Sequence, residues 1–205
     1  MRDMSEQKRV SEMAEAIDFL AIFRQIKRWL MRERDNCKVF GILVVGETGT
    51  GKSTLINNLL MKELGKGGKL SYTSDTSKIN KFNTTVEGVD VVLYDTPGLG
   101  DTRGAGRDEK YLKQMKTILD NNEIQLVLYC FKLSETRMRS SLIDTFVAYH
   151  EIGVNWEHTV MALTFADALP VPYKERQKPG FQMSQFFKDR VDALHQMISA
   201  TLVES

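Results

Sequence analysis

The fold of this chain is decided by the stretch Val39-Phe40-Gly41-Ile42-Leu43-Val44-Val45-Gly46-Glu47-Thr48-Gly49-Thr50-Gly51-Lys52-Ser53-Thr54. An apolar run over 38–45 is typical of a buried strand, and a helical pattern begins at Lys52. Between them, the phosphate-loop pattern G-x-x-x-x-G-K-[ST] is matched by Gly46, Gly51, Lys52 and Ser53. Glycines allow the backbone to approach phosphate oxygens, and free N–H groups at a helix start attract the anion. We therefore predict that residues 46–54 bind nucleotide phosphates.

Side chains of this loop and of the loop that follows its helix extend the prediction to magnesium. In phosphate loops of this kind, the lysine, here Lys52, reaches the β- and γ-phosphates, and the hydroxyl, here of Ser53, binds Mg²⁺. The hydroxyl-rich segment 70–77 stands where a nucleotide-sensing loop belongs. We expect a second magnesium ligand from this segment, Thr76, with Thr73 as the alternative.

A second motif, Asp95-Thr96-Pro97-Gly98, follows the apolar run 88–95. A carboxylate at the end of a buried strand, here Asp95, can hold Mg²⁺ through a water. The backbone N–H of Gly98 is then expected to contact the γ-phosphate and to report its loss. Together with the phosphate loop, this motif predicts a nucleotide-dependent switch.

Composition places the chain among ordinary globular proteins. It has 205 residues, of which 42% are apolar and 27% charged, enough for one domain with a sizeable core. A net charge of +1 argues against nucleic acid as a partner. Cys37 and Cys130 form no disulfide framework, which suits a reducing compartment. We therefore expect a cytoplasmic protein.

Two domains are expected, an N-terminal amphipathic helix (1–36, helical over 5–34) and a nucleotide-binding domain (37–205). One interpretation packs the helix on the domain. The other makes it a surface for a protein partner or a membrane, because its second half is basic and carries Phe23 and Trp29. Both interpretations stay open.

Strands and helices alternate along the rest of the chain. Strands are expected over 38–45, 78–87, 88–95, 124–131 and 156–165, and helices over 52–64, 108–121, 136–150 and 183–202. Segments 102–108 and 168–180 are expected to be loops. This alternation predicts an α/β fold of three layers with a mostly parallel sheet. The phosphate loop and the aspartates then meet at the carboxyl ends of the strands, where ligands of such sheets bind.

The last strand ends in Thr164-Phe165-Ala166-Asp167, where guanine-binding proteins carry [NT]-K-x-D. The carboxylate of Asp167 can accept two hydrogen bonds from guanine, and adenine lacks that pair of donors. Phe165 replaces the lysine of the pattern. It either stacks on the base or belongs to the core. Thr164 and Asp167 are therefore predicted to contact a guanine nucleotide.

On these motifs, over residues 37–168, the chain resembles the septin-related (paraseptin) GTPases. That branch includes the immunity-associated GTPases (GIMAP) and the chloroplast import receptors (Toc). The resemblance implies a GTPase G domain that binds GTP or GDP with Mg²⁺ and forms a homodimer through its nucleotide face. It also implies peripheral attachment to an organelle membrane. Members continue beyond the equivalent of Asp167 with a further strand and helix, which the pattern of this chain lacks.

The predicted reaction is hydrolysis of the γ-phosphate, aided by Lys52. Leu99 stands where Ras-like proteins have a water-orienting glutamine, so we expect slow intrinsic hydrolysis. Arg103 and Arg107, in the glycine-containing loop 102–108, are the candidates for a stimulating group, in cis or across a dimer.

Two other functions compete with this switch. One is a nucleotide-gated scaffold that binds GTP and assembles with negligible hydrolysis, which Leu99 favours. The other is a nucleotide kinase, which the Asp95-Thr96-Pro97-Gly98 motif and the lack of an arginine-rich lid disfavour.

Overall fold

The structure is a computed structural model. It describes residues 22–33, 38–64, 78–100, 105–134, 140–165 and 171–204. Several sequence predictions therefore lie outside the described residues. They concern the helix before residue 22, the residues Thr73, Thr76, Arg103 and Asp167, and the side chain of Arg107.

The described strands form one mixed sheet in the order β2-β3-β1-β4-β5. Their bounds are β1 Val39–Val45, β2 Asn80–Val86, β3 Val89–Asp95, β4 Leu126–Lys132 and β5 Thr159–Thr164. β1 pairs in parallel with β3 and β4, β4 pairs in parallel with β5, and β2 is antiparallel to β3. The predicted mostly parallel sheet is confirmed, with β1 at its centre.

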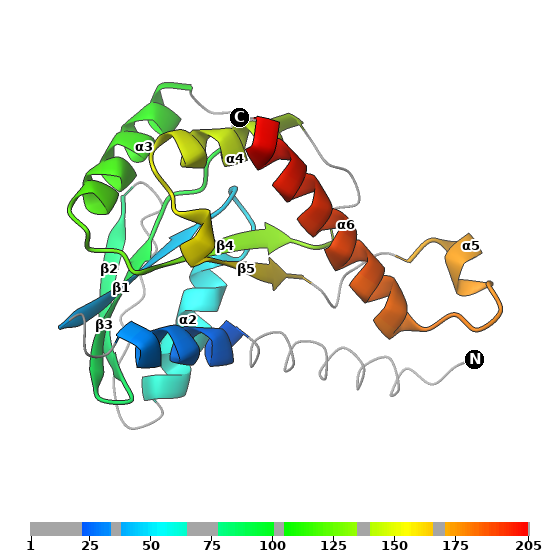
Figure 1. Ribbon diagram of the computed structural model, residues 1–205, viewed down its shortest axis with the longest axis horizontal. Helices are drawn as coiled ribbons and strands as arrows, with labels where there is room; N and C mark the ends of the chain where they lie inside the picture. Colours follow the sequence, from blue (N-terminus) through cyan, green and yellow to red (C-terminus); the bar gives the residue numbers. More distant parts are fainter. Residues whose placement is uncertain are drawn as a thin grey trace.

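Helices cover both faces of this sheet (Figure 1). Their bounds are α2 Lys52–Leu64, α3 Ala105–Asp120, α4 Ser140–Glu151, α5 Tyr173–Arg176 and α6 Met183–Glu204. Residues 22–33 are also helical. Among the helices that the described residues form, none combines the length and apolar character that a membrane span requires.

Side chains of β1 alternate between the two faces of the sheet, which divides the core in two. On one side, Phe40, Ile42 and Val44 pack with residues of α2 and of segment 22–33, among them Ile26. On the other side, core residues come from α3, α4 and the start of α6. The described part of the N-terminal helix therefore packs on the domain through its apolar face.

Three local expectations are corrected by the structure. α3 begins at Ala105, so Arg107 lies in the first turn of a helix and not in a loop. The expected strand 156–165 begins with a 3₁₀ turn, because the Asn155 side chain accepts a hydrogen bond from the N–H of Glu157 and caps it. The proline-containing segment 168–180 includes the short helix α5.

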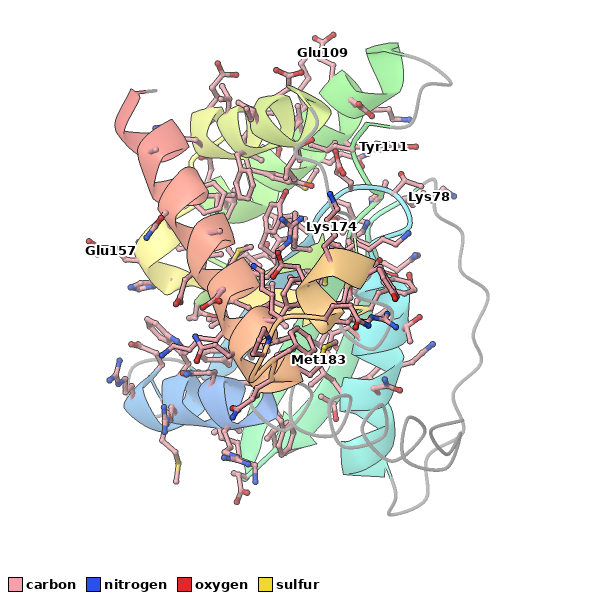
Figure 2. The ribbon with its side chains drawn as sticks, turned by 90° about the vertical axis from the view of Figure 1, so that its right-hand side faces the viewer. Lys78, Glu109, Tyr111, Glu157, Lys174 and Met183 are labelled. Atoms are coloured by element: carbon pink, nitrogen blue, oxygen red, sulfur yellow. The ribbon has the colours of Figure 1, made fainter. Side chains whose placement is uncertain are left out.

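The carboxyl ends of β4 and β5 point toward the side of the molecule that carries α5 (Figure 1). Figure 2 looks onto this side, where Lys174 of α5 and Met183, the first residue of α6, lie toward the viewer. The phosphate loop, which follows β1, belongs to the same edge of the sheet.

Candidate nucleotide site

The phosphate loop is a tight turn that packs on the neighbouring strand. Gly46 has φ of +140°, and a Cβ on it would lie 2.4 Å from the carbonyl oxygen of Cys130 in β4. Only glycine fits this combination of backbone angle and close approach. The N–H of Gly46 donates to the Tyr149 hydroxyl at 3.2 Å. Tyr149 is a fully buried residue of α4, so the start of the loop is anchored to the core by this hydrogen bond.

Lys52 lies at the start of α2 and is 7% exposed. Its Nζ donates to the carbonyl oxygens of Gly46 at 3.0 Å and Glu47 at 2.8 Å. Burial lowers the pKa of Lys52, against the opposing fields of Cys130, Asp95 and Glu47. An anionic phosphate beside this ammonium would reverse that effect, because it stabilises the charged form.

Ser53 and Asp95 meet across the gap between α2 and the end of β3. The Ser53 hydroxyl donates to Asp95 Oδ2 at 3.0 Å. The other carboxylate oxygen, Oδ1, is buried and has no hydrogen-bond partner among the described residues. Burial raises the pKa of Asp95, and the Ser53 hydrogen bond and the Lys52 charge act against it. A hydroxyl beside a carboxylate oxygen without a partner fits a magnesium site of one protein hydroxyl and one water-linked carboxylate.

The segment that follows Asp95 returns to the phosphate loop. Glu47 and Leu99 form an isolated parallel bridge. Leu99 is 3% exposed and packs in the core on the α3 and α4 side of the sheet. Its side chain therefore points away from solvent and offers no group that could orient a water molecule.

The end of β5 is tied to the phosphate loop by Thr164. Its hydroxyl oxygen lies 2.7 Å from the carbonyl oxygen of Thr50 and 3.1 Å from that of Phe131, so its single proton is shared between two acceptors. These described contacts of Thr164 are with the backbone. They hold the predicted base-binding strand against the predicted phosphate-binding loop.

Phe165 comes next and is not a core residue, because it is 43% exposed. Its backbone is left-handed, with φ of +54°. A Cβ on Gly51 would lie 3.5 Å from the ring, and Lys132 Nζ lies 5.1 Å from the ring centroid. Of the two interpretations of Phe165, burial in the core is therefore wrong.

The structure brings together most of the predicted site residues that it describes. Lys52, Ser53, Asp95 and Thr164 all lie within reach of the phosphate loop. Arg107 is described only as part of α3. Sequence reasoning missed the role of Tyr149 in fixing the start of the phosphate loop. No local pattern could reveal it, because Tyr149 lies 103 residues from its partner Gly46.

The fold and the site define a P-loop nucleotide-binding domain, with the segment that follows Asp95 beside the loop. Residues 41–164, more than half of the chain, match the family model described as "50S ribosome-binding GTPase". The chain therefore belongs to this family and carries a GTP-binding GTPase G domain.

Known proteins extend this comparison. The chain is 27% identical over 197 residues to "Translocase of chloroplast 34 homolog, chloroplastic" of Chlamydomonas reinhardtii, covering 89% of this chain and 45% of that protein. It is similar to the structure of Toc33 from Arabidopsis thaliana in complex with Mg²⁺ and GMPPNP, with a TM-score of 0.62 and 23% identity over 92% of this chain and 70% of that chain.

A third similarity is to the structure titled "Dimerization is important for the GTPase activity of chloroplast translocon components atToc33 and psToc159". Its TM-score is 0.63, with 20% identity over 89% of this chain and 70% of that chain. At 23% and 20% identity, the similarity to these two structures shows a shared fold and no more. The similarities support the Toc part of the predicted resemblance, whereas the septin and GIMAP part stays a prediction. The chain spans less than half the length of the curated relatives it matches, such as 45% and 21% of two of them.

Proposed function

We propose that this chain is a magnesium-dependent GTP switch that hydrolyses GTP slowly on its own and is regulated by pairing of two G domains. The observation that carries the proposal is the contact between Ser53 and Asp95, with one carboxylate oxygen of Asp95 buried without a described partner. Ser53 and Asp95 would hold the ion, with Thr76 as a proposed further ligand. When bound, magnesium neutralises charge on the β- and γ-phosphates. The similar Toc33 structure is a complex with Mg²⁺ and GMPPNP, which supports this assignment.

Slow hydrolysis is proposed because Leu99 occupies the place of a water-orienting residue and is buried. A stimulating group must then come from elsewhere. Arg103 and Arg107 are the proposed sources, and Lys52 would stabilise charge on the transferred phosphoryl group. Arg107 lies in the first turn of α3, close in sequence to the switch motif.

The chain would be regulated by forming a homodimer through its nucleotide face. Dimerisation is important for the GTPase activity of atToc33 and psToc159, which supports this part of the proposal. The alternative function is a scaffold that binds GTP and assembles with negligible hydrolysis. Buried Leu99 is the observation that favours it.

Single-turnover GTP hydrolysis separates the switch from the scaffold. With GTP bound to all sites, the rate constant is expected to rise by about tenfold as the protein concentration passes the dimer dissociation constant, because a complementary group supplies on the order of 1.4 kcal/mol or more to the transition state. Analytical ultracentrifugation of the same samples identifies that constant. A rate that stays negligible while dimers form would replace the switch with the scaffold.

Guanine recognition is proposed for Thr164 and Asp167, at the end of β5. β3, which carries Asp95, and β5 lie on opposite sides of β1 in the sheet. If magnesium and the γ-phosphate lie toward β3, the nucleoside must extend toward β4 and β5. Phe165 and Lys132 stand at that end, and the exposed ring of Phe165 offers a stacking surface for the base.

Titration with labelled GTP, GDP, XTP and ATP, with and without Mg²⁺, tests base selectivity. The wild-type protein is expected to prefer GTP over ATP, and chelation of Mg²⁺ should weaken GTP binding. Asp167→Asn should shift the ratio of GTP to XTP affinity toward XTP by about tenfold, because the loss of one charged acceptor pair costs on the order of 1.5 kcal/mol. An unchanged ratio would remove Asp167 from the base site.

A surface for a membrane or a protein partner is proposed on the N-terminal helix. Arg24, Arg28 and Arg32 are exposed on the face opposite to its buried residues. Basic faces of this kind bind anionic surfaces. The chloroplast translocases among the relatives support a location at an organelle surface. Flotation of the protein with vesicles that contain or lack anionic lipid tests this proposal, which fails if no anion-dependent binding occurs.

A further inference from the structure

The phosphate-loop residue Thr48 is bound to the switch segment Gly98–Gly100. Its backbone N–H donates to the carbonyl oxygen of Leu99 at 3.2 Å. Its hydroxyl donates to the carbonyl oxygen of Gly98, also at 3.2 Å. The N–H and the hydroxyl of Thr48 therefore both donate to the switch segment.

Gly98 is in direct contact with the same residue. A Cβ on Gly98 would lie 2.4 Å from the backbone nitrogen of Thr48 and 2.6 Å from its hydroxyl oxygen. No side chain fits between the backbones of Gly98 and Thr48, so the switch segment packs directly on the phosphate loop. This contact keeps the peptide of Gly98 beside the loop that holds the phosphates.

The far end of the segment is held by α3. The N–H of Gly100 donates to Asp108 Oδ2 at 3.1 Å, and Gly100 has a φ of +80° that favours glycine. Between the two ends, the Leu99 side chain is anchored in the core. Three consecutive residues are thus fixed by three different parts of the fold, and Thr48 contacts two of them.

We infer that Thr48 is a positioning residue for γ-phosphate sensing. Its hydroxyl orients the Gly98–Leu99 peptide so that the switch segment is docked on the phosphate loop before a nucleotide arrives. The inference rests on the proposed function and on the expected contact between the N–H of Gly98 and the γ-phosphate. Because docking places the segment where a third phosphate would meet it, loss of the hydroxyl weakens binding of a triphosphate more than binding of a diphosphate.

The test compares Thr48→Val, which removes the hydroxyl at nearly the same shape, with Thr48→Ser, which keeps it. Affinities for GDP and for the non-hydrolysable analogue GMPPNP are measured in the full chain. Thr48→Val is expected to lower GMPPNP affinity about fivefold relative to GDP, which corresponds to about 1 kcal/mol for one hydrogen bond. Thr48→Ser should keep the wild-type ratio.

A matched control is Thr117→Val. The hydroxyl of Thr117 donates to the Lys113 carbonyl at 3.0 Å on the exposed face of α3, away from the switch segment. This variant should leave the nucleotide ratio unchanged. Equal ratios in Thr48→Val and wild type, or a ratio shifted toward GMPPNP, would overturn the inference while nucleotide binding by the wild type upholds the proposed function.

Hydrogen exchange provides a measurement that needs no nucleotide. In Thr48→Val, amides of the peptide that contains Gly98–Gly100 should exchange about fivefold faster than in wild type, because the docked segment opens more often. Thr117→Val should not change them. Unchanged exchange in Thr48→Val would show that the hydroxyl does not hold the segment, whatever the nucleotide affinities are.

Discussion

Replacing Lys52 with alanine is expected to weaken GTP and GDP binding by at least about 100-fold, which corresponds to about 2.7 kcal/mol. The ammonium group has three donors. Two of them are engaged by the carbonyl oxygens of Gly46 and Glu47, which leaves one directed donor and the full charge for a phosphate oxygen. At about 4 Å and an effective dielectric constant of about 20, one pair of charges contributes about 4 kcal/mol. Isothermal titration calorimetry measures the loss.

Folding and binding effects of this variant are separable. Lys52→Ala removes the desolvation cost of a buried cation but also leaves the carbonyl oxygens of Gly46 and Glu47 without this donor, so the melting temperature of the variant is measured beside its nucleotide affinity. Lys113→Ala is the matched control, since Lys113 is an exposed lysine of α3 paired with Glu109. Its removal should change nucleotide affinity by less than about twofold, as expected for a surface ion pair. Micromolar GTP affinity in Lys52→Ala would contradict the assignment of the phosphate loop.

Replacing Gly41 with alanine is expected to lower the free energy of unfolding by about 3–5 kcal/mol, out of the roughly 5–15 kcal/mol typical of a domain. A Cβ on this residue of β1 would lie 1.7 Å from the carbonyl oxygen of Glu123 and 2.8 Å from its carbonyl carbon. Both are backbone atoms of the turn that leads into β4, so no change of rotamer relieves the clash. Urea-induced unfolding followed by circular dichroism measures the difference.

Two hydrogen bonds hold the same crossing in place. The N–H of Gly41 donates to Gln125 Oε1 at 2.6 Å, and the N–H of Gln125 donates to the Gly41 carbonyl at 3.0 Å. Gly88→Ala is the control, because a Cβ there meets open space and only the φ of +79° opposes alanine. That cost is about 1–2 kcal/mol. Equal destabilisation by the two substitutions would show that the close approach at Gly41 is not the cause.

Local sequence rules predicted most of the elements but not all of their ends. α2 begins at Lys52 and β3 ends at Asp95, as the motifs predicted. The expected boundary between strands 78–87 and 88–95 coincides with the turn between β2 and β3, where Glu87 and Gly88 both have positive φ. The start of α3 was missed by three residues, because glycines near Ala105 suggested a loop. Capping by Asn155 was missed because its effect depends on one side-chain hydrogen bond.

By itself, the sequence determined the phosphate loop, the position of Asp95 at a strand end and the alternation that produces a parallel sheet. These features depend on spacing within short segments, which periodicity and motifs record. The tertiary structure alone decided that Leu99 is buried, that Phe165 is exposed beside Gly51, and that Thr48 meets Gly98. It also placed the carbonyl of Glu123 so close to Gly41 that only glycine fits there. The physical reason is that these contacts join segments far apart in the chain, 103 residues for Gly46 and Tyr149 and 114 for Thr50 and Thr164, and such contacts leave no local pattern.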